Sequence, residues 1–343
     1  MLSKVFKVIE PKRFDMYIED VKTEANDVLI KVDYISICKA DLRYYEGTRD
    51  ARVLSLKYPM SLIHEATGIV LKDPQGQYNV GQKIVMIPNR VERKACEHCV
   101  CDHPQLGENY CPKALFASSN SDGFSKEIIA YPHQYILPVP VGLENKYAVF
   151  SEMLSVAIAA IRRIEIPNGT IAIWGDGVLG YLIVSALRFL NKDNRIIVVG
   201  KHREKVMKFP VNKYFMINEN IDEQIALAFE CVGGNGAVSA INQILKEISV
   251  GGEVILTGVT EQEVPISTRK ILEKGIKVSG ITRSQKSDFE VALHLLQQEE
   301  FLPFINSLIL SENKISSITE FYYAFEKESK NKLLGKHLMQ LQF

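Results

Sequence analysis

The chain has 343 residues, of which 46% are hydrophobic and 24% charged, as in a soluble globular protein large enough for two domains. Lys plus Arg equals Asp plus Glu at 41 each, so the overall charge gives no reason to expect nucleic-acid or anionic-membrane binding. No signal-peptide pattern and no membrane-length apolar run occurs, so we expect a cytoplasmic protein whose six cysteines are thiols or metal ligands.

The first part of the chain reads as a β-rich domain, which we place at residues 1–147. Short alternating runs at 28–34, 68–71 and 83–88 are separated by Gly, Pro and Asn, as between short strands.

From about residue 150 the pattern changes to strands alternating with helices. A helix is expected at 152–164, and buried strands at 170–174, 195–199, 227–232, 253–258 and 276–280. This alternation predicts a doubly wound parallel sheet, a Rossmann domain, over 148–285. Residues 286–343 are expected to hold one helix, at 288–298, and a closing segment, at 335–341, that completes the catalytic domain.

A glycine-rich loop, Gly175-Asp-Gly177-Val178-Leu179-Gly180, lies directly after one predicted strand and directly before a helix. This context is that of a dinucleotide-binding loop, in which the glycines allow a tight turn and close approach of the pyrophosphate to the backbone and the helix N-terminus. The alternative is a glycine-rich turn in another α/β fold.

The next strand ends in Gly200-Lys201-His202-Arg203, without the carboxylate that bonds the ribose 2′-hydroxyl in NAD sites. Lys201 and Arg203 would instead attract a 2′-phosphate, which predicts NADPH. One alternative is that Lys201 and Arg203 belong to a solvated loop without a cofactor contact. Another is that Glu204 supplies the carboxylate for the ribose 2′-hydroxyl.

Further cofactor contacts are expected just after the other parallel strands, where ligands bind in such sheets. These positions are Val232, Thr257, Gly258 and Val259.

Four metal-capable residues occur in three separate segments: Cys38, His64 with Glu65, and Glu152. A thiolate, an imidazole and a carboxylate make a catalytic zinc set with an open position. Taken singly, each residue is as easily explained by core packing or a structural hydrogen bond.

Three motifs resemble the medium-chain polyol dehydrogenases: Cys38-Lys-Ala-Asp-Leu-Arg-Tyr-Tyr-Glu-Gly, His64-Glu65-x-x-Gly68, and Glu152-Met-Leu-Ser-Val with Arg162-Arg163. The resemblance implies a GroES-like catalytic domain beside the Rossmann domain, catalytic zinc bound by Cys38, His64 and Glu152 with Glu65 adjacent, and a homodimer.

The match is closer to the ribulose-5-phosphate reductases of ribitol-phosphate synthesis. It rests on the runs Arg43-Tyr-Tyr-Glu-Gly-Thr-Arg49-Asp50, Pro59-Met-Ser-Leu-Ile-His64-Glu65, Ile173-Trp-Gly-Asp-Gly, Phe229-Glu-Cys-Val-Gly-Gly, Ser239-Ala-Ile-Asn-Gln and Leu272-Glu-Lys-Gly. This resemblance implies NADPH-dependent reduction of D-ribulose 5-phosphate to D-ribitol 5-phosphate, feeding CDP-ribitol for teichoic acid or capsule. It also implies a functional pairing with a cytidylyltransferase that forms CDP-ribitol.

Two features depart from the wider family. Ala40 stands where a proton-relay Ser or Thr is usual, which leaves Glu65, Tyr44, Tyr45 or a metal-bound water as proton source. The cysteine run resembles the family's structural zinc lobe, with altered spacing. Its members are Cys96, Cys99, Cys101 and Cys111, with His98, Asp102 and His103 as substitutes.

The substrate phosphate requires cations. Arg43 and Arg49 are the first candidates, with Lys39 and Arg283 weaker, because guanidinium groups match phosphate oxygens in pairs. The same arginines could instead form ordinary surface ion pairs. Reduction of another ketose phosphate, oxidation of an unphosphorylated polyol, and a non-catalytic cofactor-binding role remain as alternative functions.

Overall fold

A computed structural model of the chain describes residues 1–91 and 106–343. The chain divides into two compact units, one of Met1–Ser155 with Ser284–Phe343, the other of Val156–Arg283. The C-terminal segment therefore completes the unit that the N-terminal residues begin. The domain ranges inferred from sequence stay a prediction.

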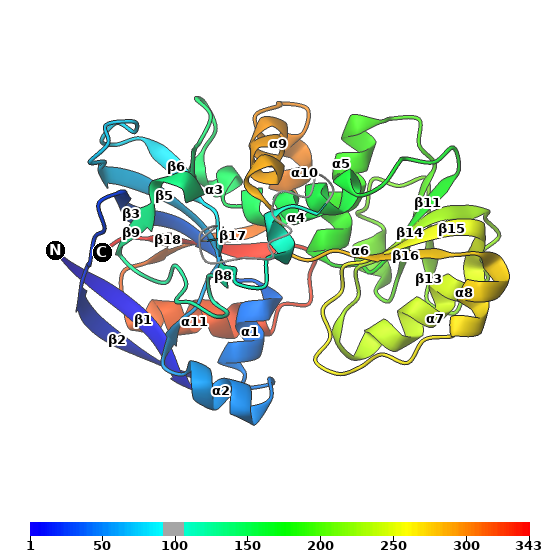
Figure 1. Cartoon of the computed structure of the whole chain (residues 1–343), viewed down its shortest axis with the longest axis horizontal. Helices are drawn as coiled ribbons and strands as arrows, with labels where there is room; N and C mark the ends of the chain where they lie inside the picture. Colours follow the sequence, from blue (N-terminus) through cyan, green and yellow to red (C-terminus); the bar gives the residue numbers. More distant parts are fainter. Residues whose placement is uncertain (92–105) are drawn as a thin grey trace. The chain divides into compact units, whose positions relative to one another are not determined.

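The first unit is built mainly of strands (Figure 1). They are β1 (Leu2–Glu10), β2 (Arg13–Asp20), β3 (Asp27–Ser36), β4 (Met60–Ser61), β5 (Glu65–Lys72), β6 (Lys83–Met86), β7 (Asn89–Arg90), β8 (Leu115–Phe116), β9 (Ile128–Pro132), β10 (Ile136–Pro138), β17 (Ile309–Ile315) and β18 (Lys336–Leu341). The main sheet has the order β10-β6-β5-β3-β18-β17, with β9 also paired to β3, and a smaller sheet has the order β2-β1-β4. The pair β7-β8 stands apart.

Helices of this unit lie between the strands and after the second unit. They are α1 (Lys39–Tyr45), α2 (Ala51–Lys57), α3 (Asn145–Ala148), α9 (Lys286–Leu296), α10 (Leu302–Asn306) and α11 (Ile318–Ser329), with 3-10 turns η2 (Glu108–Tyr110) and η3 (His133–Tyr135). Helix α4 (Ser151–Arg162) begins in the first unit and ends in the second.

The expectation of one helix after residue 285 is wrong, because α10, α11 and strand β17 also lie there. Helix α11 has local start signals: the Ser317 hydroxyl accepts the Glu320 N–H, and the Glu320 carboxylate accepts the Ser317 N–H. Its buried residues Phe321, Ala324 and Phe325 follow helical spacing. The signal was present in the sequence and was missed.

The second unit contains one six-stranded parallel sheet of order β13-β12-β11-β14-β15-β16, which confirms the predicted sheet. Its strands are β11 (Thr170–Trp174), β12 (Ile196–Gly200), β13 (Lys213–Met216), β14 (Ile225–Glu230), β15 (Ile248–Leu256) and β16 (Lys277–Gly280). Its helices are α5 (Val178–Leu190), α6 (Arg203–Val206), α7 (Ala237–Glu247) and α8 (Thr268–Lys274), with the 3-10 turn η4 (Gly234–Gly236).

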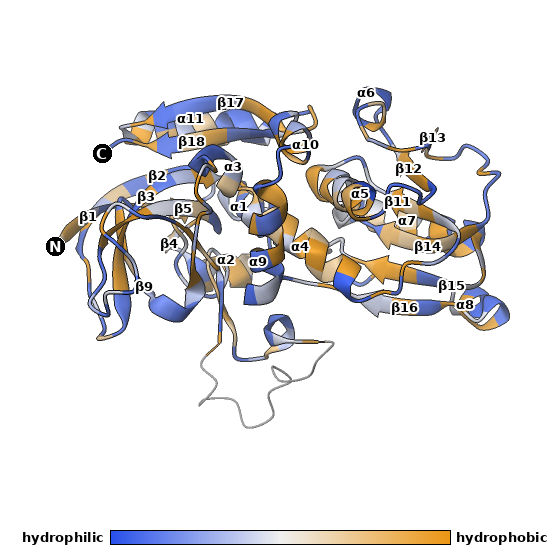
Figure 2. Cartoon of the chain, turned by 90° about the horizontal axis from the view of Figure 1, so that it is seen from above, coloured by the Kyte–Doolittle hydropathy of each residue, from blue (hydrophilic) through white to orange (hydrophobic). Residues whose placement is uncertain are grey.

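Every residue of β11 and β12 is buried, as expected of strands covered on both faces. The apolar character of the central strands is visible in Figure 2. On one face, Ala172, Trp174 and Val199 form a core cluster with Ile241 and Ile244 of α7. This packing fixes the carboxyl ends of the strands, where the predicted cofactor loops begin.

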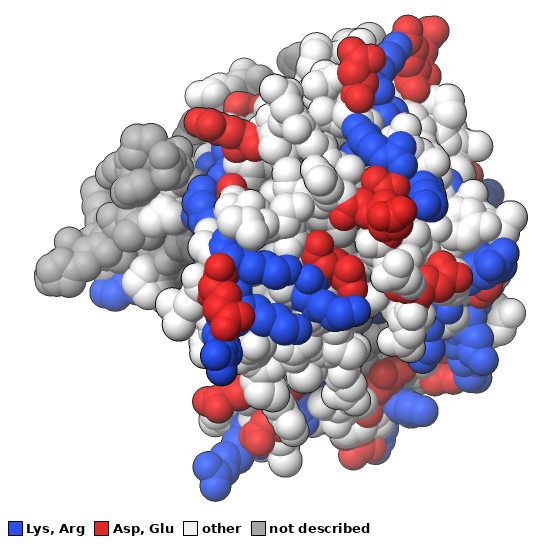
Figure 3. All heavy atoms as spheres, turned by 90° about the vertical axis from the view of Figure 1, so that its right-hand side faces the viewer, with Lys and Arg blue, Asp and Glu red and all other residues white. Residues whose placement is uncertain are grey.

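Within the described parts of the chain, no helix is long and apolar enough to cross a bilayer. On the face shown in Figure 3, Lys and Arg side chains are interspersed with Asp and Glu, in line with the equal numbers of the two kinds.

Candidate metal centre and cofactor loops

Strand pairing in the first unit brings the first two metal-ligand motifs together. Cys38 lies in the turn between β3 and α1, and His64 lies in the turn between β4 and β5. Since β3 and β5 are antiparallel with Ser36 opposite Glu65, the end of one strand meets the beginning of the other. The turn before His64 contains Ile63 at φ +77°, a conformation that is costly for a β-branched residue.

Cys38, His64 and Glu65 form a cluster in which one ligand-capable atom from each lies within 4.8 Å of the others. His64 and Glu65 are buried and Cys38 is half-buried. Sulfur, imidazole nitrogen and carboxylate oxygen are the donors that Zn²⁺ takes in proteins, so these residues fit a divalent ion of that kind.

Asp41 organises this cluster and had no role in the sequence analysis. Its fully buried carboxylate accepts the N–H of Cys38 at 2.9 Å and of Ile63 at 3.1 Å, the Ser118 hydroxyl, and the Nδ1 side of His64 at 3.2 Å. A carboxylate on Nδ1 fixes the ring and leaves Nε2 for ligation. Its place three residues after Cys38 was the only sequence signal.

The charges around His64 favour its protonated form when no ion is bound. Burial by itself lowers the pKa of His64, but Asp41 and Cys38 raise it, and the net direction is well upward. A divalent cation would satisfy the same negative groups and keep the imidazole neutral.

Lys336, the first residue of β18, forms a buried ion pair with Glu65. Its ammonium group lies 2.5 and 2.6 Å from the two carboxylate oxygens and donates to the Ile37 carbonyl at 3.3 Å. Burial alone lowers the pKa of Lys336, while Glu65 and then Cys38 raise it, and the net direction is upward. Glu65 is thus neutralised by a lysine that no sequence motif indicated.

Glu152 lies in the first turn of α4 and is buried, outside the three-residue cluster but close enough to interact with it electrostatically. Burial raises the pKa of Glu152, the Glu65 and Asp41 carboxylates add to the rise, and His64 and Lys336 oppose it. A buried carboxylate that is repelled electrostatically by two others is a group that a divalent cation would stabilise in its charged form.

The cysteine lobe lies largely outside the described residues. Cys96, Cys99 and Cys101, with His98, Asp102 and His103, are among residues 92–105. Cys111 is buried and packs with Val91 and Ala114.

The candidate phosphate-binding residues fall into both units. Lys39 and Arg43 belong to α1, and the Arg49 guanidinium lies over the Tyr44 ring with 4.4 Å to its centroid. Arg283, at φ +58°, is the last residue of the second unit. The structure therefore brings Lys39, Arg43 and Arg49 into one unit with the metal-ligand cluster.

Of the two tyrosines considered as proton source, Tyr45 has its hydroxyl group hydrogen-bonded to another side chain. The Tyr45 hydroxyl donates to Glu326 at 2.7 Å, and its ring stacks on Phe14 in the core. Burial and the Glu326 carboxylate raise the pKa of Tyr45, which favours its neutral form. Tyr44 is also buried, and its backbone carbonyl accepts the Tyr58 hydroxyl.

All predicted cofactor residues lie at the carboxyl ends of the parallel strands of the second unit. Gly175, at φ +126°, follows β11, and Gly177 precedes α5, whose first residues are Val178, Leu179 and Gly180. Strand β12 ends at Gly200 and is followed by Lys201, His202 and Arg203. Val232, Gly258 and Val259 follow β14 and β15. The geometry is that of a dinucleotide site at the point where the strand order reverses.

The end of β12 does carry a carboxylate, which comes from Asp176 in the glycine loop. One Asp176 oxygen accepts the N–H groups of Lys201 at 2.8 Å and His202 at 2.7 Å, and faces the His202 ring nitrogen at 2.9 Å. Burial raises the pKa of Asp176, but these N–H donors outweigh it and the net direction is downward. A Cβ at Gly200 would lie 2.9 Å from that of Asp176, so position 200 has no room for a side chain.

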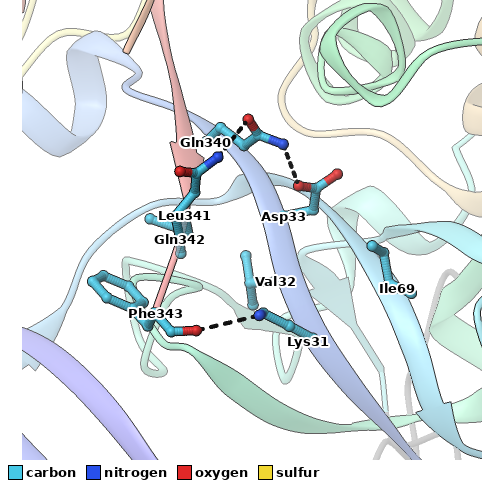
Figure 4. A pocket seen from close by; sticks show the side chains of 8 residues that line it. All are labelled: Lys31, Val32, Asp33, Ile69, Gln340, Leu341, Gln342 and Phe343. Carbon is cyan, nitrogen blue, oxygen red and sulfur yellow. Dashed lines mark hydrogen bonds between the residues drawn. The ribbon is translucent and has the colours of Figure 1, made fainter. Parts of the chain in front are cut away.

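A pocket of about 420 Å³ lies at the other end of β18 from Lys336, lined by Lys31, Val32, Asp33, Ile69 and Gln340–Phe343 (Figure 4). Its polar groups already bond each other: Gln340 donates to Asp33 at 3.1 Å and Lys31 donates to the Phe343 carbonyl at 3.3 Å. It is therefore a different place from the metal-ligand cluster.

Comparison with known proteins agrees with this arrangement. Residues 24–141 match the alcohol dehydrogenase GroES-like domain, which confirms the predicted catalytic domain type. Ribulose-5-phosphate reductase 1 of Staphylococcus aureus is 38% identical over 96% of both chains, and the ribulose-5-phosphate reductase of Streptococcus pneumoniae is 33% identical over 95% of this chain and 94% of that one.

Solved structures show the same fold over the whole length. S. aureus TarJ in complex with NADPH is 33% identical with a TM-score of 0.86, and each chain is covered completely. L-idonate 5-dehydrogenase of Escherichia coli, 22% identical, reaches the same TM-score over 100% of this chain and 99% of that one. This chain is a member of the ribulose-5-phosphate reductase family and contains an alcohol dehydrogenase GroES-like domain.

Proposed function

We propose that this chain catalyses the NADPH-dependent reduction of D-ribulose 5-phosphate to D-ribitol 5-phosphate. The observation that carries the proposal is the cluster of half-buried Cys38 with buried His64 and Glu65, supported by Asp41, in a chain whose full-length relatives are named ribulose-5-phosphate reductases. In this reaction a hydride from the nicotinamide adds to C2 of the ketose, a proton completes the new hydroxyl, and NADPH becomes NADP⁺.

In the proposal Cys38, His64 and Glu152 hold a zinc ion, with Glu65 beside them as a further donor. A bound divalent ion would supply polarisation of the C2 carbonyl oxygen. Asp41 holds the His64 ring in the tautomer that leaves Nε2 for the metal, and Lys336 balances the charge of Glu65. The ion pair on Glu65 is the reason to prefer Glu152 as the carboxylate ligand.

Arg43 and Arg49, aided by Lys39 and Arg283, are proposed to bind the substrate phosphate. Lys201 and Arg203 are proposed to bind the 2′-phosphate of the cofactor, on a loop whose backbone Asp176 fixes. The Asp176 carboxylate fixes this loop through one of its two oxygens, which accepts the N–H groups of Lys201 and His202.

The wider setting is also proposed, from family resemblance: a cytoplasmic homodimer that works beside a cytidylyltransferase forming CDP-ribitol, for teichoic acid or capsule. A second, structural zinc is proposed at Cys96, Cys99, Cys101 and Cys111.

The test is the initial rate of NADPH oxidation with D-ribulose 5-phosphate, compared with D-ribulose, D-xylulose 5-phosphate and D-fructose 6-phosphate, and with NADH. Preference for ribulose 5-phosphate and NADPH supports the proposal. Turnover of another ketose phosphate, or only of D-ribulose, would contradict the substrate. No turnover by protein shown to contain its metal would favour the non-catalytic role.

The phosphate site is tested by Arg43→Ala and Arg49→Ala. Each should raise KM for ribulose 5-phosphate by about 10- to 100-fold, because hydrogen bonds between charged groups are worth about 1.5–3 kcal/mol. KM for NADPH should hardly change. Arg52→Ala, an exposed arginine on the adjacent helix α2, is the matched control. An arginine whose replacement leaves this KM unchanged has no place in the phosphate site.

A further inference from the structure

Glu230 is a buried carboxylate at the end of β14 whose role no motif assigns. Only 1% of it is exposed. One oxygen accepts the N–H groups of Val232 at 2.8 Å and Gly233 at 2.9 Å, and the other accepts the N–H of Gly258 at 3.0 Å. One side chain thus satisfies three backbone donors from two separate loops, those after β14 and β15.

Other contacts tie the same two loops together. The Thr257 hydroxyl donates to the Glu230 carbonyl at 2.7 Å, and the Gly234 N–H donates to the Val259 carbonyl at 3.0 Å. Gly258 must lack a side chain here, because a Cβ would lie 2.5 and 2.6 Å from the two Glu230 oxygens. The absence of a side chain lets the carboxylate reach the loop backbone.

The strand order indicates which half of a dinucleotide these loops serve. A dinucleotide crosses the sheet where the order reverses, between β11 and β14, and its adenine ribose lies at the end of β12. The loops after β14 and β15 lie on the other side of that point. They therefore face the nicotinamide half, and Val232 and Val259, about half exposed, are the side chains they present.

We propose that Glu230 is a positioning residue for the nicotinamide half of the cofactor: its carboxylate fixes the loops that carry Val232, Gly258 and Val259. The inference rests on the proposed NADPH-dependent function. An amide in place of the carboxylate would turn its NH₂ toward at least one backbone N–H, so the donors could no longer all be satisfied.

The test is Glu230→Gln, with NADPH and adenosine 2′,5′-bisphosphate as ligands in calorimetric titrations. The Kd for NADPH should rise by about tenfold or more, because charge-assisted hydrogen bonds in the loop are lost. The Kd for adenosine 2′,5′-bisphosphate should stay unchanged, since this ligand lacks the nicotinamide half. A loss of folding stability alone would not change the Kd for NADPH and leave the Kd for adenosine 2′,5′-bisphosphate unchanged.

Glu223→Gln is the matched control in the same unit. Glu223 also accepts charged and hydroxyl donors, from Arg195 at 2.9 Å and Thr170 at 3.4 Å, but at the amino ends of the strands. Both Kd values should equal those of the wild type. Glu230→Asp, which keeps the charge on a shorter side chain, should recover part of the NADPH affinity.

If Glu230→Gln does not fold, Gly258→Ala is used instead, because its methyl group would clash with the same carboxylate. The Kd values for the two ligands are measured in the same way. Equal Kd values for NADPH in the variant and the wild type would overturn the inference but not the proposed function. A parallel loss of affinity for both ligands would also overturn it. A wild type that binds neither NADPH nor NADH would overturn the proposed function and the inference with it.

Discussion

Replacing Lys336 by methionine should destabilise the unit that holds the metal-ligand cluster by about 3–5 kcal/mol, the cost of removing one partner of a buried ion pair. The side chains of Lys336 and Glu65 are 5% and 0% exposed, and the ammonium group contacts both carboxylate oxygens. Methionine keeps most of the volume but leaves the carboxylate without a counter-charge in a dry site. For a unit of this size the loss corresponds to a fall in Tm of about 6–20 °C.

The assay is thermal unfolding in the presence of a chelator, because a bound cation would compensate Glu65. Lys330→Met is the control: its pair with Glu326 lies on the surface of the same unit and should cost about 0–1 kcal/mol. The double variant Lys336→Met with Glu65→Gln should recover much of the lost stability, since the buried charge is gone. If Lys336→Met had the same Tm as the Lys330→Met control, the buried-pair reasoning would be refuted.

Three further predictions concern the two sites. Asp41→Asn should lower zinc affinity by about 10- to 100-fold, because the carboxylate that orients His64 is lost; competition with a chelator measures this, and unchanged affinity would contradict it. Lys201→Ala combined with Arg203→Ala should raise KM for NADPH by about tenfold or more and leave that for NADH nearly unchanged. An equal change for both cofactors would argue against a 2′-phosphate site. Glu152→Gln should lower the zinc content of the purified protein; full zinc content would point to Glu65 as the carboxylate ligand.

Much of the fold could be predicted because its signals are local. The central strands of the parallel sheet are continuous apolar runs, and the glycine loop is defined by spacing within one turn. The first two metal-ligand motifs were also found locally, and antiparallel pairing of β3 with β5 then brought them together. Helix α11 was missed although its capping residues and apolar spacing are equally local.

The supporting residues could not be predicted, since their partners are distant in sequence. Lys336 and Glu65 are 271 residues apart in the sequence, and no pattern near either residue indicates that they form an ion pair. Asp176 supplies a carboxylate at the end of β12 from a different loop, which inspection of β12 alone cannot find.

The sequence by itself determined which residue types stand at the strand ends and turns, because side-chain periodicity and turn chemistry act over a few residues. Only the tertiary structure decided how their charges are balanced. Burial makes an unpaired carboxylate costly, so Asp41, Glu65 and Glu230 each take donors from whatever segments the fold brings within reach.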